Sequence, residues 1–321
     1  MIRLALSLLL TLASAGAAFA QSGWPDRPIR VIVPLPAGAA VDIVGRLVCQ
    51  KLGDRLGQTI VLENKPGASG AIASDIVAKA APDGYTLGMA TSTTHVTTAI
   101  LNAKLPYDPV KDFVPVALIG VVPYVLTVSP NLPAKNVAEL LALAKAKPRT
   151  LSYSSVGNAS QGHLATELMS SMTGIQLNHI PYRTTAQAVL DLAEGRIDIT
   201  FGLLSTNLPL IRDGRIRALA VTTDKRVPEA PGVPTMSEAG VPGFEASLWF
   251  AVVAPAAVPP AVAGRLNREI NAVLSDDDVK KTLAAQAITV EVSTPDKLRE
   301  TIRADIEKWR GIATKLGIKP E

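Results

Sequence analysis

The sequence predicts an α/β protein of two lobes that are joined by two crossover strands and hold a ligand cleft between them. Three observations lead to this prediction. Short apolar extended runs alternate with helical apolar patterns along most of the chain. Two extended runs, residues 113–120 and 124–129, follow one another with no room for a helix, and a third at 247–254 returns the chain after a second alternation. Two crossings between α/β lobes indicate a hinged clamshell.

The first twenty residues are predicted to be a secretory signal peptide and are set aside from the fold. Arg3 precedes an apolar run at residues 4–12, and the segment ends in Ala18-Phe19-Ala20. We therefore expect cleavage after Ala20 and an exported mature chain.

The first lobe is predicted from a repeated β-α-β pattern. Its elements are a strand at 29–33, a helix with Val44, Leu47, Val48 and Leu52 on one face, a strand at 59–63, a helix at 71–80, a turn at 82–84 and a strand at 86–91. Such a repeat favours a parallel sheet covered by helices. In open α/β sheets, ligands bind at the carboxyl end of the strands. Thr91 to His95 follow the last of these strands and are therefore expected at that end.

The second lobe repeats the plan after the run at 124–129. Its predicted elements are a helix capped by Asn136 and Glu139, a strand at 150–156, a helix from the N-cap Ser160 to Gly174, an extended run at 179–182, a helix capped by Thr185 and ending at Gly195, and strands at 197–201 and 216–223. Residues 225–243 contain four prolines and three glycines and are predicted to be a surface connection.

The chain then returns to the first lobe. The run at 247–254 is the predicted return strand, and helices follow at 261–274, 277–285 and 295–316, the last capped by Thr294. The predicted domains are therefore discontinuous: residues 21–123 with 250–321 form the first, and residues 124–249 form the second.

Composition excludes several classes of function. Removing Arg3 with the signal peptide leaves 31 of the 32 basic residues against 28 acidic residues, a scattered excess that does not favour nucleic-acid binding. After the signal peptide no stretch reaches the roughly eighteen apolar residues of a membrane span. The single cysteine, Cys49, falls in an apolar helical pattern and is expected to be a buried thiol. Three histidines and one cysteine provide no spaced zinc ligands, and no metal or organic cofactor is expected.

Two small-residue loops are the candidate binding elements. The first, at residues 34–42, lies between a strand and a helix, where backbone N–H groups at the helix start can face an anion. The second, Ser155-Val-Gly-Asn-Ala-Ser-Gln-Gly-His163, is polar and contains glycine, and it also precedes a helix. Neutral hydroxyl, amide and backbone donors can bind an anion without a buried countercharge.

Nearly the whole mature chain resembles the Bug (TctC-type) family of periplasmic substrate-binding proteins of tripartite tricarboxylate transporters. The matching segments, in order, are Pro36-Ala-Gly-Ala-Ala-Val-Asp42, Glu63-Asn-Lys-Pro-Gly-Ala-Ser-Gly70, Ala81-Pro-Asp-Gly-Tyr-Thr-Leu87, Leu105-Pro-Tyr-Asp-Pro109 with Lys111-Asp-Phe113, His163-Leu164, Pro181-Tyr182, Arg217-Ala-Leu-Ala-Val-Thr222, and Pro231-Gly-Val-Pro-Thr235 with Glu238-Ala-Gly240. The order and number of these matches carry the resemblance, since each alone is common.

The resemblance implies a type II-like periplasmic-binding-protein fold, no catalysis, and a small organic carboxylate as ligand, aromatic or aliphatic. It also implies delivery to inner-membrane permease subunits, and we expect a monomer. In this family the two loops hold one ligand carboxylate, partly through water. The ligand-binding residues expected here are Pro36, Ala37, Gly38, Ala39, Ala40, Thr91, Ser92, Ser155, Gly157, Asn158, Ala159, Ser160, Gln161, His163, Gly202 and Leu203.

The chain departs from the family pattern at two places. Gly38-Ala39 stands where Gly-Gly is common, which narrows the backbone freedom of the first loop. Gly202-Leu203 follows Phe201 where the family commonly has Asp-Asn. Without that acid a ligand amino group lacks an obvious partner, so we expect a ligand other than an amino acid, with a less polar distal half.

Several side chains have a structural interpretation beside the functional one. We expect Asp42 to cap the first helix, because it would repel a bound carboxylate. His163 either orients the second loop or touches ligand; His95 is a weaker candidate of the same kind, and His179 is expected to be structural. Arg183 is expected to be a surface or hinge-side charge rather than a carboxylate partner. The alternative function is a secreted serine hydrolase of small esters, using Ser155 or Ser160 with His163.

Overall fold

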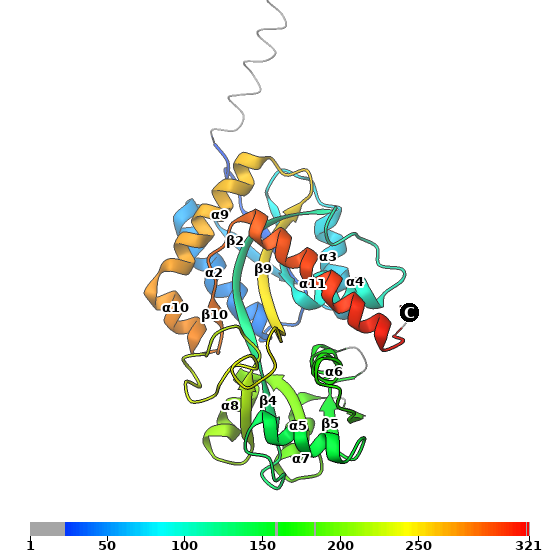
Figure 1. Cartoon of the computed structure of the whole chain (residues 1–321). Coiled ribbons are helices and arrows are strands. Elements are labelled where there is room, and N and C mark those ends of the chain that lie inside the picture. The colour runs from blue at the N-terminus through cyan, green and yellow to red at the C-terminus, as the bar shows by residue number, and fades with distance from the viewer. Residues whose placement is uncertain (1–22, 158–159, 183, 319, 321) are drawn as a thin grey trace, which may run out of the picture.

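The computed structural model describes residues 23–157, 160–182, 184–318 and 320, and within them it has the predicted two-lobed α/β architecture. Figure 1 shows one lobe above the other, with the long strand β4 (Phe113–Val128) running through both. The residues of the predicted signal peptide lie outside the described part of the chain.

The first lobe contains both ends of the described chain. Its other elements are β1 (Ile29–Val33), α2 (Ala40–Leu56), β2 (Ile60–Asn64), a turn at Ala68–Gly70, α3 (Ala71–Ala78), β3 (Thr86–Thr91), a π-helical turn at Thr93–Thr97, α4 (Thr98–Leu101), β9 (Ser247–Pro255), α9 (Pro260–Ser275), α10 (Asp277–Ala284), β10 (Thr289–Val290) and α11 (Pro295–Lys315). Where an element was predicted, these bounds agree with it to within about two residues, apart from β4. The turn at Ala68–Gly70, the π-helical turn and α4 were not predicted, and the prediction of an entirely helical end missed β10.

The second lobe is continuous in sequence. It contains α5 (Val137–Ala146), β5 (Ser152–Ser155), α6 (Gln161–Thr173), β6 (Asn178–Pro181), α7 (Thr185–Ala193), β7 (Ile199–Leu203), α8 (Leu204–Arg212) and β8 (Arg217–Val221). The caps follow the sequence signals: Asn136 and Glu139 bond reciprocally, Ser160 is the N-cap of α6, and Gly174 ends that helix with φ at 73°. One cap was wrong by one residue, because Thr184, not Thr185, accepts the backbone N–H of Gln187.

The prediction of two separate extended runs at 113–120 and 124–129 was wrong. They form the single sixteen-residue strand β4, since residues 121–123 between them keep the extended backbone and pair with β9. Residues up to Pro123 pair with β9, and those from Tyr124 onward pair with β7 and β8. The strand thus changes partners at one point, between Pro123 and Tyr124.

The sheet is mixed rather than parallel throughout. Strands β1, β2 and β3 are parallel, as are β5, β6 and β7, but β4 and β9 run antiparallel to each other and to their other neighbours. The full order is β2-β1-β3-β9-β4-β7-β5-β6, with β8 and β10 also on β4. The two strands that cross between the lobes run antiparallel to their neighbours. A β-α-β repeat in the sequence does not reveal this direction.

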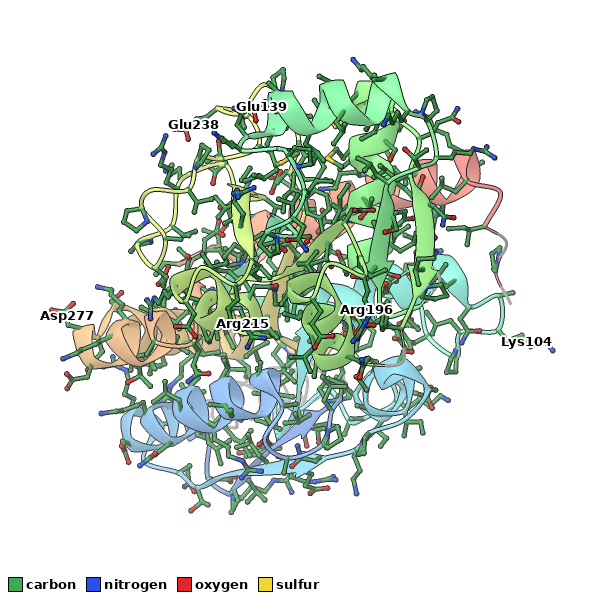
Figure 2. The ribbon with its side chains drawn as sticks, turned by 90° about the horizontal axis from the view of Figure 1, so that it is seen from below. Lys104, Glu139, Arg196, Arg215, Glu238 and Asp277 are labelled. Atoms are coloured by element: carbon green, nitrogen blue, oxygen red, sulfur yellow. The ribbon has the colours of Figure 1, made fainter. Side chains whose placement is uncertain are left out.

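The apolar core is continuous across the two lobes. One cluster of buried side chains includes Trp249 and Trp309 of the first lobe and Leu126 and Tyr153 of the second. Cys49 packs in a second cluster around α2 and α9, and burial raises the pKa of its thiol to about 12, so the prediction of a buried cysteine is confirmed. Lys104, Glu139 and Asp277, labelled in Figure 2, lie at the periphery, where charges of both signs are spread.

Candidate ligand-binding cleft

A cavity of about 590 Å³ lies between the lobes, within the size range of small-molecule sites. The first lobe contributes Ala68, Ser69, Thr93, Thr97, Thr98, Leu101 and Asn102, and the second lobe contributes Val156, Ser160 and Gln161, with Tyr124 of β4 between them. Its described wall is therefore built from hydroxyl, amide, small and apolar side chains.

A second cavity of about 160 Å³ adjoins the first and lies within the second lobe. It is lined by Tyr124, Ser155, Val156, Gln161, Gly162, Thr185, Ala188, Val189, Thr200, Phe201, Gly202 and Leu203. Tyr124, Val156 and Gln161 belong to the walls of both cavities. These three side chains form the boundary between the two compartments.

The second predicted loop lies at these cavities. Ser155, Ser160 and Gln161 line one or both of them, at the carboxyl end of β5 and the start of α6. Gly157, with φ at 115°, joins the two serines because its carbonyl oxygen accepts from the hydroxyls of Ser155, at 2.9 Å, and Ser160, at 2.8 Å. The predicted Asn158 and Ala159 lie outside the described residues, as does Arg183.

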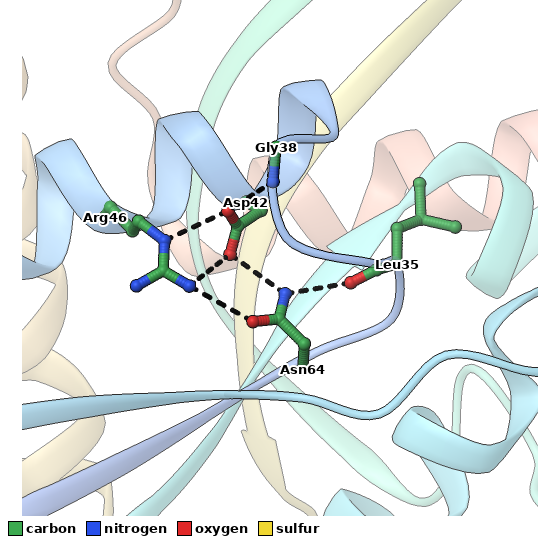
Figure 3. A network of polar contacts seen from close by, with 5 residues as sticks. All are labelled: Leu35, Gly38, Asp42, Arg46 and Asn64. Atoms are coloured by element: carbon green, nitrogen blue, oxygen red, sulfur yellow. Dashed lines mark hydrogen bonds and ion pairs between the residues drawn. The ribbon is translucent and has the colours of Figure 1, made fainter.

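The first predicted loop is held in shape by the carboxylate of Asp42, as Figure 3 shows. The backbone N–H of Gly38 and the guanidinium of Arg46 donate to this carboxylate, and so does the amide of Asn64, at 2.9 to 3.0 Å. The bond with Arg46 is the main reason why the pKa of Asp42 falls to about 2. Asp42 lies in the first turn of α2 rather than at the N-cap, which is Ala39, but it binds an N–H at the helix start as a cap does.

The glycine and alanine of this loop have different backbone requirements. Gly38 has φ at 85°, a conformation that favours glycine, whereas Ala39 is extended, with φ at −68°. The Gly-Ala departure from the family pattern therefore costs the loop no strain. The described walls of the two cavities do not include Pro36, Ala37, Gly38, Ala39 or Ala40.

The segment after β3 forms the floor of the cleft. Thr91 and Ser92 are buried behind the cavity, and Ser92 lies 3.2 Å from the side-chain nitrogen of Gln161. The following threonines, Thr93, Thr97 and Thr98, line the cavity itself and were not predicted. Their signal was the threonine-rich continuation of the same segment, which forms a π-helical turn, a feature often found at functional sites.

A left-handed turn also lines the larger cavity, through Ala68 and Ser69. Residues 67 to 70 all have positive φ, including Ala68 at 47° and Ser69 at 54°. Non-glycine residues rarely adopt this conformation, and such strain concentrates at functional sites. The segment belongs to the pattern that resembles the family, but its position at the cleft was not predicted, since Ala and Ser give no sign of a left-handed backbone.

The three histidines lie in different surroundings: one is in the core, and two are stacked beside the second loop. His95 is buried against Phe113, with ring centroids 4.7 Å apart, and burial lowers its pKa to about 3, so it lies in the core rather than at the cavity. His163 stacks on His179, whose Nε2 lies 2.7 Å from the hydroxyl oxygen of Ser155. His179 therefore supports the second loop from behind, and the expectation that it is structural agrees with this geometry.

The position of Gly202 is enclosed by Asn207 of α8. A Cβ atom at Gly202 would lie 2.2 Å from the side-chain nitrogen of Asn207, which is fully buried. The amide of Asn207 thus fills the space into which a side chain at residue 202 would project. Leu203 adds an apolar wall to the smaller cavity.

Within the described residues, no helix is long and apolar enough to cross a membrane. No group of three or more metal-ligating side chains is found there either.

Comparisons with known proteins agree on one family. The model of the tripartite tricarboxylate transporter family receptor, TctC, matches residues 44–318. The chain is similar to protein BugT of Bordetella pertussis, with 39% identity over 99% of both chains. It also resembles two solved structures from Rhodopseudomonas palustris. Rpa4515 with adipate has 38% identity and a TM-score of 0.77 over 93% of this chain and 100% of that one. MatC with bound malate has 31% identity and a TM-score of 0.72 over 90% and 99%. The chain therefore belongs to the TctC family of tripartite tricarboxylate transporter receptors.

Proposed function

We propose that this receptor captures a small organic carboxylate, an aromatic or aliphatic mono- or dicarboxylate, in the cleft between its lobes. The observation that carries the proposal is the larger cavity, which places hydroxyl and amide groups of both lobes beside the first turn of α6. Neutral donors and a helix N-terminus favour an anion without a buried countercharge. The adipate and malate held by the two similar structures support the same ligand class.

The proposed binding residues are those predicted from the sequence. Ser155, Ser160, Gln161, Gly202 and Leu203 line the cavities, which supports them most directly. Thr91, Ser92, Gly157 and His163 act from behind the wall. Pro36 to Ala40 do not line the described cavities, and their support is the Asp42 network, which fixes the shape of this loop at the start of α2.

Closure is proposed to load the receptor. Donors from both lobes meet one ligand, so the ligand binds the closed state more tightly and shifts the population toward it. The hinge is proposed where β4 changes partners, which agrees with the first predicted boundary, between residues 123 and 124. The return boundary, predicted between residues 249 and 250, falls inside β9.

We also propose that the mature chain, cleaved after Ala20, works as a periplasmic monomer that delivers its ligand to inner-membrane permease subunits. N-terminal sequencing of the protein from a periplasmic fraction tests the cleavage, with Gln21 as the expected first residue. Sedimentation of the same sample tests the monomer.

The site is proposed to bind its ligand without catalysis. Ser155 contacts His179 rather than the predicted His163, and its hydroxyl also donates to the carbonyl of Gly157. The carboxylate of Glu167 accepts a hydrogen bond from the hydroxyl of Tyr153. These bonds suit a serine that shapes a loop more than one that attacks an ester.

A thermal-shift screen of the mature protein against carboxylate classes tests the function. A ligand at a hundred times its Kd should stabilise the protein by about 2.7 kcal/mol. If no carboxylate raises the melting temperature while a small ester is hydrolysed, and Ser160→Ala abolishes the hydrolysis, the hydrolase alternative is correct. Tight binding of aspartate or glutamate would contradict the argument drawn from Gly202.

A further inference from the structure

Gln161 connects the two lobes from within the wall of the cleft. It is the first residue of α6, only 6% of its surface is exposed, and it borders both cavities. Its side-chain nitrogen lies 3.2 Å from the hydroxyl oxygen of Ser92 and 3.4 Å from that of Thr97, both in the first lobe. A residue of the second lobe is thus anchored on two hydroxyls of the first.

The other end of the Gln161 amide has no hydrogen-bond partner among the described residues, although it is buried. Leaving a buried polar atom unpaired costs stability, because water satisfied it before burial. The hydroxyls of Ser92 and Thr97 can donate as well as accept. Both contacts therefore survive a rotation of the amide by half a turn, which exchanges its oxygen and nitrogen.

We propose that Gln161 couples ligand binding to the contact between the lobes, and this inference rests on the proposed function. With a carboxylate in the cleft, the amide N–H₂ donates to a carboxylate oxygen while the amide oxygen accepts the hydroxyl protons of Ser92 and Thr97. The empty closed state leaves one end of the amide unpaired, whereas the loaded closed state pairs both. The carboxylate thus stabilises closure selectively, which is the condition for a population shift.

Ser92 is a positioning residue in this arrangement. It is fully buried and does not belong to the described wall of either cavity, so its effect on a ligand passes through Gln161. Ser154 provides a matched control, because it is equally buried, lies on β5, and does not belong to that wall either.

The test measures the Kd of adipate, with malate as a second probe, for Gln161→Met, Ser92→Ala and the double variant. Loss of a hydrogen bond to a charged group should weaken binding about tenfold or more in Gln161→Met. Ser92→Ala should weaken it severalfold, and the double variant should bind no more weakly than Gln161→Met alone, because both changes act through one amide. Ser154→Ala should bind like the wild type.

Small-angle scattering provides the readout of closure. Saturating adipate should reduce the radius of gyration of the wild type, and this compaction should be smaller in Gln161→Met even though its cleft is filled. Additive losses of affinity in the double variant, or full compaction of Gln161→Met, would overturn the inference. If the wild type binds neither probe nor any carboxylate in the thermal-shift screen, the proposed function fails instead.

Discussion

The imidazole rings of His163 and His179 are stacked, with centroids 4.3 Å apart and planes inclined by only 4°. Tyr153 also stacks against this pair, with its ring centroid 4.8 Å from that of His179 and 6.2 Å from that of His163. Burial lowers the pKa of both histidines, and the neighbouring His163 helps to lower that of His179 to about 4. Both rings are therefore neutral at pH 7, which is why they can lie face to face behind the second loop.

Acid should destabilise the protein through these rings. A histidine whose pKa is lower in the folded state binds fewer protons there than in the unfolded chain, so stability falls as pH decreases from about 6.5 toward 4. Replacing His163 by Phe keeps an aromatic ring and removes one titrating group. We expect NMR titration of His163→Phe to give a higher pKa for His179, and its melting temperature to fall less between pH 7 and 5. An unchanged His179 pKa would contradict the influence of the stacked neighbour.

Asp42→Ala should destabilise the first lobe. The carboxylate accepts four hydrogen bonds and is buried, so its removal leaves the N–H of Gly38 and the amide of Asn64 without this partner. We expect a loss of about 2 kcal/mol in urea unfolding at pH 7. Because the pKa of Asp42 is depressed, its contribution is complete above the unfolded value of roughly 3.9 and disappears as pH falls through about 2. The exposed Asp54 of the same helix is the control, and an equal effect of Asp54→Ala would refute the role of the network.

Gly157→Ala should weaken ligand binding more than it weakens folding. A side chain at φ of 115° strains the backbone by about 1–3 kcal/mol, although no atom lies within 4 Å of the new Cβ. That strain shifts the carbonyl on which Ser155 and Ser160 converge. Gly174→Ala introduces comparable strain, with φ of 73°, at the distant end of α6. Calorimetry should find reduced affinity only for Gly157→Ala; matching affinities would argue against the loop as a binding element.

The size of the smaller cavity should select ligand length. Ala188 of α7 is buried and lines only this compartment, so Ala188→Leu fills part of its roughly 160 Å³. We expect adipate to lose at least about fivefold in affinity, since overpacking typically costs about 1–3 kcal/mol, and the shorter malate to lose less. Ala186 is exposed on the same helix, and Ala186→Leu should leave both affinities unchanged. Equal losses for the two acids would show that ligands do not enter this compartment.

Local signals in the sequence predicted most of the elements. Helix ends depend on neighbouring residues, so they could be predicted without knowing the tertiary structure. Examples are the N-caps Asn136 and Ser160 and the left-handed C-terminal residue Gly174. Thr184 and Thr185 are the same residue type, so the sequence does not distinguish them as caps, and the structure has Thr184 in that position.

Contacts between distant residues could not be predicted in the same way. The bond from Gln161 to Ser92 joins residues 69 positions apart, and the stacking of His163 on His179 depends on how α6 packs over β5 and β6. The continuous β4 was missed because Gly120 and Pro123 resemble strand breakers. In the structure Pro123 pairs with Ser247 at the very start of β9, so the strand continues through it.

The pairing of β3 with β9 also sets an order for folding. Gly88 pairs with Val253, so the sheet of the first lobe cannot be completed until the last quarter of the chain is available. The strands β5, β6 and β7 of the second lobe lie close together in sequence and can pair earlier. A chain that emerges N-terminus first therefore exposes β1 to β3 while the second lobe folds. During that time the edge of β3 that later pairs with β9 is unpaired. Chaperone binding or aggregation is expected to begin at that edge, whose last residue, Thr91, leads into the segment that lines the cleft.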